Sequence, residues 1–192
     1  MKARAALVCI ALLLAACGRQ APWHLTDISG AMPPLEFSMT RANDGQAVAA
    51  GDYRGKVTVL YFGYTHCPDV CPTTLANLSG ALKQLGHKAK NVRVLFVSVD
   101  PDRDTLPVLK SYVAAFAPQV DGLRGNPNAL TALTRRYRAI YNVTPASPGH
   151  AYEVTHSNTI YVFDRTGRAR LVGTSTQDTR GIADDVERLL GE

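Results

Sequence analysis

The chain has 192 residues, with 21 Lys and Arg against 16 Asp and Glu, which gives a formal net charge of +5. A chain of this length accommodates one domain with a hydrophobic core of its own. The basic residues are scattered rather than gathered with aromatic side chains into a stripe, so the composition gives no indication of nucleic-acid binding.

The first residues have the composition of a signal peptide. Lys2 and Arg4 form a short basic region, and the apolar residues 5–14 that follow are too few to span a bilayer. The sequence Leu14-Ala15-Ala16-Cys17-Gly18 resembles a bacterial lipobox, in which Cys17 becomes the lipidated first residue of the mature protein. Cleavage as an ordinary secretory signal is the alternative.

This pattern predicts a lipoprotein signal peptide at residues 1–16, a lipidated N-terminus and tether at residues 17–34, and a folded domain at residues 35–192. The lipid would attach the protein to a membrane of the bacterial cell envelope. The domain is therefore expected in the periplasm or another extracytoplasmic space. Because Cys9 leaves with the signal peptide and Cys17 carries the lipid, two cysteines remain for chemistry.

Hydrophobic periodicity predicts alternating strands and helices along the domain. The expected strands lie at residues 35–39, 47–49, 57–63, 92–99, 158–164 and 169–174, and the expected helices start near residue 71 and at residues 105, 129 and 179. In the helix at residues 129–141, Leu130, Leu133, Tyr137 and Ile140 are expected to point inward. Parallel strands come first and an antiparallel pair later, which predicts an α/β, thioredoxin-like fold with an N-terminal β-hairpin and an inserted helix.

The two remaining cysteines, Cys67 and Cys71, are expected on the turn between the strand at residues 57–63 and the next helix. Residues four apart on a helix have β-carbons about 5–6 Å apart, which suits a disulfide or two sulfur ligands of one metal ion. A helix N-terminus favours negative charge, so both thiols are expected to ionise more readily than a free cysteine. A purely structural disulfide is a weaker explanation, because so small a loop restricts little chain entropy.

A metal ion held by two thiolates needs another ligand, and His156 is the candidate. In a thioredoxin-like fold, the loop before the strand at residues 158–164 lies beside the cysteine turn. A loop histidine bonded only to backbone is the alternative. His66 is expected to modulate the thiols rather than bind metal, and His150 lies in a Gly- and Pro-containing loop, residues 144–155, that could cover the site.

The acidic run Asp100-Pro101-Asp102-Arg103-Asp104-Thr105 follows the strand at residues 92–99. Its alternating carboxylates imitate an EF-hand loop. However, Thr105 replaces the glycine at the sixth position and Ser111 the glutamate at the twelfth, so calcium binding is excluded. Helix capping is the expected role of Asp104 or Thr105. Asp100 and Asp102 are expected at the same sheet edge as the cysteines, where they could attract a metal ion or a basic partner.

These motifs resemble those of the SCO/SenC family of copper proteins, which serve the assembly of cytochrome c oxidase. The resemblance covers about residues 33–190, and it is carried by Gly55-Lys56, the run from Phe62 to Thr74, the run from Val97 to Thr105, and His156-Ser157. It implies a thioredoxin-like fold and copper ligands at Cys67, Cys71 and His156. The chain departs from the family at Thr155, where members often carry an acid, and at Pro107, since the family proline often follows the threonine directly.

The resemblance implies a copper-binding metallochaperone rather than an enzyme. It would bind Cu(I), and could accept Cu(II), receive copper from an upstream donor and deliver it to the dicopper site of cytochrome c oxidase subunit II. The same cysteines would also serve a thiol-disulfide reductase that keeps the oxidase's copper-ligand cysteines reduced. Reductases of this fold usually have a two-residue spacer, whereas three residues separate Cys67 from Cys71. Reduction is therefore the alternative hypothesis.

Overall fold

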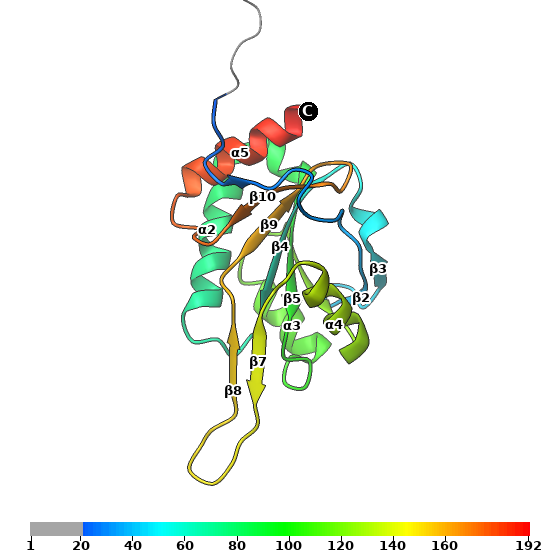
Figure 1. The fold of residues 1–192 in the computed structure, drawn as a ribbon, viewed down its shortest axis with the longest axis vertical. Helices are drawn as coiled ribbons and strands as arrows, with labels where there is room; N and C mark the ends of the chain where they lie inside the picture. The colour runs from blue at the N-terminus through cyan, green and yellow to red at the C-terminus, as the bar shows by residue number, and fades with distance from the viewer. Residues whose placement is uncertain (1–20) are drawn as a thin grey trace, which may run out of the picture.

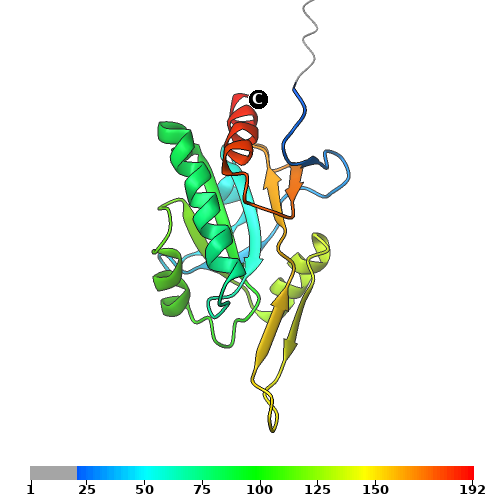
Figure 2. The ribbon, with the colours of Figure 1, turned by 90° about the vertical axis from the view of Figure 1, so that its left-hand side faces the viewer.

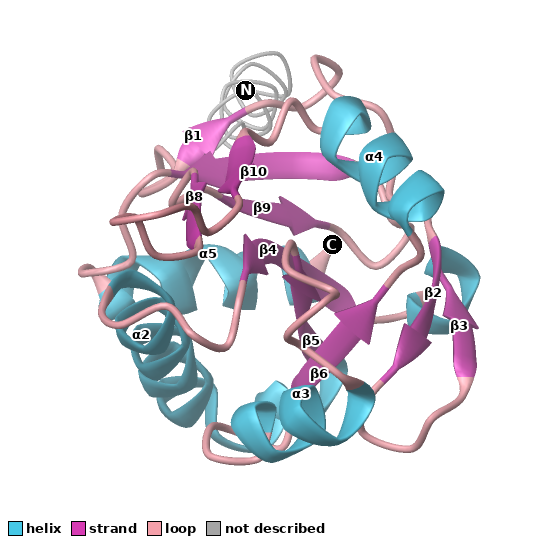
Figure 3. Ribbon diagram, turned by 90° about the horizontal axis from the view of Figure 1, so that it is seen from below, coloured by secondary structure: helices cyan, strands magenta, loops and turns pink. Residues whose placement is uncertain are grey.

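The computed structural model describes residues 21–192, so the predicted signal peptide and the lipidation site Cys17 lie outside the described residues. Within this range the main sheet has eight strands in the order β1-β10-β9-β4-β5-β6-β2-β3 (Figures 1 and 3). These strands are β1 (Thr26–Asp27), β2 (Ser38–Arg41), β3 (Ala47–Ala49), β4 (Val57–Gly63), β5 (Val92–Ser98), β6 (Val120–Arg124), β9 (Ile160–Phe163) and β10 (Ala169–Gly173).

The centre of the sheet is the pair β4 and β5, which run parallel with Val57 opposite Val92 and Gly63 opposite Ser98. All seven residues of β4 are buried, as the continuous apolar run predicts for a strand covered on both faces. β6 is parallel to β5, whereas β9 is antiparallel to β4. The expected sequence of parallel strands followed by an antiparallel pair is confirmed.

Helices cover both faces of this sheet. α2 (Val70–Leu85), α3 (Leu106–Val113) and α5 (Thr179–Gly191) lie on one face, and α4 (Pro127–Arg136) lies on the other (Figure 3). Short 3-10 helices, η1 (Ala50–Tyr53) and η2 (Gly86–Asn91), precede β4 and β5.

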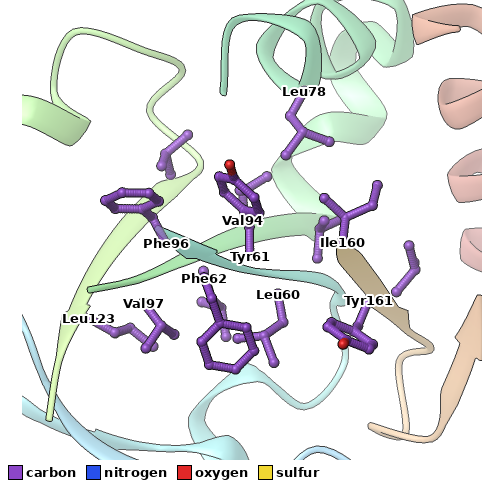
Figure 4. Close-up of a cluster of buried hydrophobic side chains, with 14 of the residues drawn as sticks. Leu60, Tyr61, Phe62, Leu78, Val94, Phe96, Val97, Leu123, Ile160 and Tyr161 are labelled. Atoms are coloured by element: carbon purple, nitrogen blue, oxygen red, sulfur yellow. The ribbon is translucent and has the colours of Figure 1, made fainter. Parts of the chain in front are cut away.

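The core accordingly has two layers (Figure 4). Tyr61 points toward the α2 side with Leu78, whereas its neighbours Leu60 and Phe62 point to the opposite side. This alternation follows from the two-residue period of a strand. Complete burial of each such side chain contributes about 1.5–3 kcal/mol to folding.

Some sequence-based boundaries were wrong. β2 starts at Ser38 rather than at residue 35, and β6 was not predicted, because Asp121 and Gly122 interrupt its apolar pattern. α4 ends at Arg136, and Arg138 then adopts a positive φ of 54°. The expected inward position of Ile140 is therefore wrong, since this side chain follows the helix and is 75% exposed.

The segment between α4 and β9 forms a second, two-stranded sheet. β7 (Tyr141–Thr144) pairs antiparallel with β8 (Glu153–His156), and Tyr141 lies opposite His156. Figures 1 and 2 show this hairpin extending away from the body of the domain. Residues 145–152 connect the two strands, as the expected loop does, but they extend away from the domain instead of lying over the cysteines. The base of the hairpin, rather than its tip, is beside the cysteine turn.

The N-terminal residues that the sequence assigned to the tether also contact the domain. β1 pairs with β10, Thr26 lying opposite Val172. The backbone N–H groups of His24 and Leu25 donate to the Asp185 carboxylate at 3.1 and 2.8 Å. Among residues 21–192, none of the helices has the length and hydrophobicity of a membrane-spanning segment.

Candidate metal centre

Two sulfur ligands and one imidazole meet at the carboxyl end of β4. Sγ of Cys67, Sγ of Cys71 and a ring nitrogen of His156 all lie within 4.8 Å of one another. Cys67 is in the turn after β4, Cys71 is the second residue of α2, and His156 is the last residue of β8. The sequence hypothesis that His156 approaches the cysteine pair is confirmed by this placement.

Gly63 makes room for the buried cysteine. A β-carbon at this position would lie 2.7 Å from Sγ of Cys71 and 2.5 Å from Cε2 of Phe96, which is closer than van der Waals contact allows. The turn that follows is closed by two hydrogen bonds. The N–H of Cys67 donates to the carbonyl of Tyr64 at 3.3 Å, and the N–H of Cys71 donates to Sγ of Cys67 at 3.4 Å.

Asp104 fastens the start of the cysteine turn to the loop after β5. Its fully buried carboxylate accepts hydrogen bonds from the backbone N–H of Thr65 at 3.1 Å, from the Thr65 hydroxyl at 2.6 Å and from the Ser98 hydroxyl at 2.6 Å. The predicted capping role is wrong, because Thr105 occupies the N-cap of α3 without a side-chain hydrogen bond and the Asp104 carboxylate is directed to Thr65 and Ser98.

The two thiols differ in environment. Cys71 is completely buried, whereas Cys67 is half-buried. Burial raises the pKa of Cys71 to about 12, and the hydrogen bonds it receives only partly oppose this effect. The expectation that both thiols ionise readily is therefore wrong for Cys71. A helix terminus contributes about 0.3–1 kcal/mol, less than one pKa unit, while burial can shift a pKa by up to about 3–5 units.

The imidazole of His156 presents its unprotonated nitrogen to the sulfurs. Nδ1 lies 3.1 Å from the carbonyl oxygen of Ser157, and a carbonyl can only accept, so in the neutral ring Nδ1 carries the proton. Nε2 then has its lone pair free, 3.1 Å from Sγ of Cys71. Burial lowers the pKa of His156, more than the bond to Ser157 raises it. The neutral form, which is the form that binds metals, is favoured.

This set of atoms is suited to a soft metal ion. Bonds of about 2.0–2.3 Å keep two ligands of one ion within roughly 4.6 Å of each other, so the three atoms are close to the spacing that a single ion needs. Thiolates select ions such as Cu(I) and Zn(II). An ion would replace the thiol protons, so its binding would release protons and remove the cost of ionising the buried Cys71.

The other candidate residues are not brought to the sulfurs. His66 is exposed, with Nδ1 3.1 Å from the Thr65 hydroxyl oxygen, and it groups with Asp100 and Asp104 rather than with the cysteines. Both of these carboxylates are already hydrogen-bonded within the protein. His150 is exposed near the tip of the β7–β8 hairpin, and its backbone pairs with that of Ser147.

Sequence reasoning missed the residues that support the three ligand groups. Tyr64 and Thr65 lie within the run that carries the family resemblance, but the sequence assigned neither of them a role at the site. Tyr152 contacts the loop after β5 through Asp100 and Arg103. The alternation of Tyr152, Val154 and His156 was the available signal, since it is typical of one face of a strand.

Comparison with known proteins identifies relatives of this chain. The family model described as SCO1/SenC matches residues 33–191. The mitochondrial SCO2 homolog of Bos taurus is 35% identical over 146 residues, which are 75% of this chain and 55% of that protein. The chain thus spans about half the length of this curated relative.

Two solved structures extend the comparison. Bradyrhizobium japonicum ScoI, determined with copper bound, is 37% identical, with a TM-score of 0.74 over 82% of this chain and 99% of that chain. The apo Sco1 protein of Thermus thermophilus is 33% identical, with a TM-score of 0.78 over 90% of this chain and 100% of that chain. These similarities confirm the thioredoxin-like α/β fold.

Proposed function

The chain belongs to the SCO1/SenC family, and we propose from this premise that it is a copper-binding metallochaperone for the dicopper site of cytochrome c oxidase subunit II. The observation that carries the proposal is the convergence of Cys67, Cys71 and His156. The copper-bound ScoI structure supports copper as the ion, and the family's link to cytochrome c oxidase assembly supports the acceptor. Residues 35–192 would form the copper-binding domain.

In this proposal Cys67, Cys71 and His156 hold Cu(I) in a low-coordinate site, and the same ligands could accept Cu(II). Cys71 is completely buried, whereas Cys67 and His156 are half-buried, so an acceptor's ligand would approach from the side of Cys67 and His156. Each incoming ligand would replace one of the protein's ligands, and the copper would pass without being released into water. Oxidation of the two thiols to a disulfide would remove both sulfur ligands and stop binding.

We further propose that Cys17 carries a lipid anchor after removal of residues 1–16, that residues 17–34 connect it to the domain, and that the domain works in the periplasm or another extracytoplasmic space. The lipobox-like sequence supports this location. An upstream copper donor would load the site there, and subunit II would be the acceptor.

The second candidate function is thiol-disulfide reduction, which the contrast between the two cysteines favours. The accessible Cys67 thiolate would attack a disulfide of the acceptor and form a mixed disulfide. Cys71, once deprotonated, would attack Sγ of Cys67. The products would be a Cys67–Cys71 disulfide and two thiols on the acceptor, so two electrons pass from this protein to the acceptor. Its apolar surroundings raise the pKa of Cys71 to about 12, which makes the second step slow unless a base assists.

An anaerobic titration of the reduced, metal-free protein with Cu(I) against a competing chelator tests the first function. We expect one tightly bound ion, loss of binding in Cys67→Ser, and binding weaker in His156→Ala by at least the roughly 10–100-fold that the loss of an outer-shell partner alone costs. His150→Ala is the matched control, because it removes an exposed histidine from the same hairpin and should not change the affinity. Weak binding that is insensitive to His156→Ala would contradict the three-ligand site and leave reduction as the better hypothesis.

A further inference from the structure

The position of His156 depends on how β8 lies against the domain, because β7 and β8 form a sheet separate from the main sheet. Alternate residues of an extended strand share one face, so Tyr152, Val154 and His156 point to the same side. Val154 is buried and the other two are half-buried, whereas Glu153 and Thr155 are exposed. The face that carries His156 therefore lies against the body of the domain.

Tyr152 is fixed by two residues of the loop after β5. Its hydroxyl donates a hydrogen bond to Oδ1 of Asp100 at 3.0 Å, and the guanidinium of Arg103 lies 4.2 Å from the centre of its ring. Asp100 is completely buried, and its second oxygen forms a close ion pair with Nε of Arg103. Charge-assisted hydrogen bonds to a buried carboxylate are stronger than neutral ones, so this contact anchors the hairpin firmly.

The same guanidinium also faces the cysteine turn. Arg103 lies 5.6 Å from the centre of the Tyr64 ring. The Tyr64 ring in turn meets the His156 ring edge to face, with centres 5.7 Å apart and an interplanar angle of 89°. Arg103 thus contacts both the Tyr152 ring of the hairpin and the Tyr64 ring of the cysteine turn.

We propose that Asp100, Arg103 and Tyr152 form a positioning clamp that holds β8 against the cysteine turn and keeps Nε2 of His156 next to the sulfurs. The clamp residues are not among the three candidate ligands, so they act through His156. The consequence for copper rests on the proposed function. When the clamp opens, the histidine moves with the hairpin and a site with two sulfur ligands remains.

Tyr152→Phe tests the clamp, because it removes the hydroxyl that reaches Asp100 and keeps the ring. Tyr141→Phe is the matched control: it makes the same change on the same hairpin, at a hydroxyl without a hydrogen bond to any other residue within 21–192. Arg103→Lys keeps a positive charge near Asp100 but removes the planar group between the two rings, so it should have an effect in the same direction as Tyr152→Phe.

Two measurements are made on these variants. In the metal-free protein, amide hydrogen exchange of β7 and β8 should be faster in Tyr152→Phe than in wild type, with exchange of β4 and β5 unchanged. In the Cu(I) titration, Tyr152→Phe should weaken binding about tenfold, and Tyr141→Phe should leave it unchanged. In a His156→Ala background Tyr152→Phe should have no further effect, because the ligand that the clamp positions is gone.

The clamp would be overturned if the hairpin of Tyr152→Phe exchanged its amide hydrogens at the wild-type rate. It would also be overturned if Tyr152→Phe weakened Cu(I) binding equally in the wild-type and His156→Ala proteins. A wild-type protein that fails to bind Cu(I) would instead contradict the proposed function. In that case the exchange measurement, which needs no metal, still decides whether the clamp holds the hairpin.

Discussion

Nε2 of His156 lies 3.1 Å from Sγ of Cys71, although 85 positions separate the two residues in the chain. One of them starts a helix of the main fold, and the other ends a strand of the separate hairpin. The candidate centre is therefore formed between two structural units. The main fold supplies two sulfur ligands and the hairpin supplies one imidazole nitrogen, so the relative position of the two units decides whether the site has two ligands or three.

The contrast between the thiols predicts their order of reaction. In the reduced, metal-free protein, Cys67 should be alkylated by iodoacetamide at pH 8 at least about tenfold faster than Cys71, because Cys71 is buried and its thiolate is disfavoured. With the pKa of Cys71 raised to about 12, its rate should keep rising with pH well beyond pH 9. Peptide mapping by mass spectrometry gives both rates, and faster labelling of Cys71 would contradict the described environment.

Two glycines should respond in opposite ways to alanine. Gly63→Ala would place a methyl group against Sγ of Cys71 and the Phe96 ring, so we expect it to lower the free energy of unfolding by about 1–3 kcal/mol and to weaken metal binding. Gly80→Ala, in α2, meets its nearest atom at 3.8 Å and should stabilise the helix by up to about 1 kcal/mol. Urea unfolding of both variants measures the difference, and equal effects would refute the close contact at Gly63.

The hydrogen bonds of Asp104 predict a role in the stability of the cysteine turn. Asp104→Asn replaces a charged acceptor of three hydrogen bonds, so the free energy of unfolding should fall by about 1–3 kcal/mol. Asp102→Asn changes an exposed acid in the same loop and is the control, expected to have little effect. If the two variants unfold alike, the Asp104 bonds do not contribute measurably.

A pH-dependent contribution to stability is expected from Asp164 in the β9–β10 turn. Burial alone would raise its pKa, but hydrogen bonds from Thr166 and Arg168 outweigh this effect and lower the pKa below the usual 3.8. The ionised form is thus favoured in the folded state. Its contribution is present above the ordinary pKa and is lost as the pH falls through the lowered one.

Asp164→Asn should accordingly cost about 1.5–3 kcal/mol at pH 7, and its difference from wild type should shrink below pH 4. Urea unfolding at a series of pH values between 7 and 3 provides the comparison. A difference that stays constant with pH would show that the charge of Asp164 does not stabilise the turn.

The sequence predicted those parts of the fold that local patterns specify. The apolar run of β4 and the helical spacing after Cys71 placed the cysteines correctly, and the thioredoxin-like order of elements placed His156 near them. β6 was missed because its sequence, which includes Asp121 and Gly122, is not apolar throughout. The strand is buried because neighbouring elements cover it. The hairpin was missed because the Pro and Gly residues near its tip are typical of loops, and nothing in them indicates the pairing of Tyr141 with His156.

The sequence did not allow us to predict which side chains contact each other when they are far apart in the chain. Asp104 is next to a helix start, so capping was the natural local interpretation, but its acceptor atoms bind Thr65, 39 positions away. Likewise the helix terminus near Cys71 was recognised, whereas the complete burial that dominates the pKa of Cys71 is a property of the tertiary fold. Local rules identify which groups are present; the tertiary fold determines which of them meet.

The contacts of the first described residues determine where the chain leaves the domain. The guanidinium of Arg188 lies over the Trp23 ring, with its central carbon 3.7 Å from the ring centre. β1 continues the sheet beside β10. Figure 1 shows this segment at one end of the long axis and the β7–β8 hairpin at the other. A restraint that acts through residues before Ala21 would therefore act at the end of the molecule opposite the β7–β8 hairpin. The hairpin tip therefore lies at the far end of the molecule from that attachment, and the candidate metal centre lies at the hairpin base, between the tip and the body of the domain.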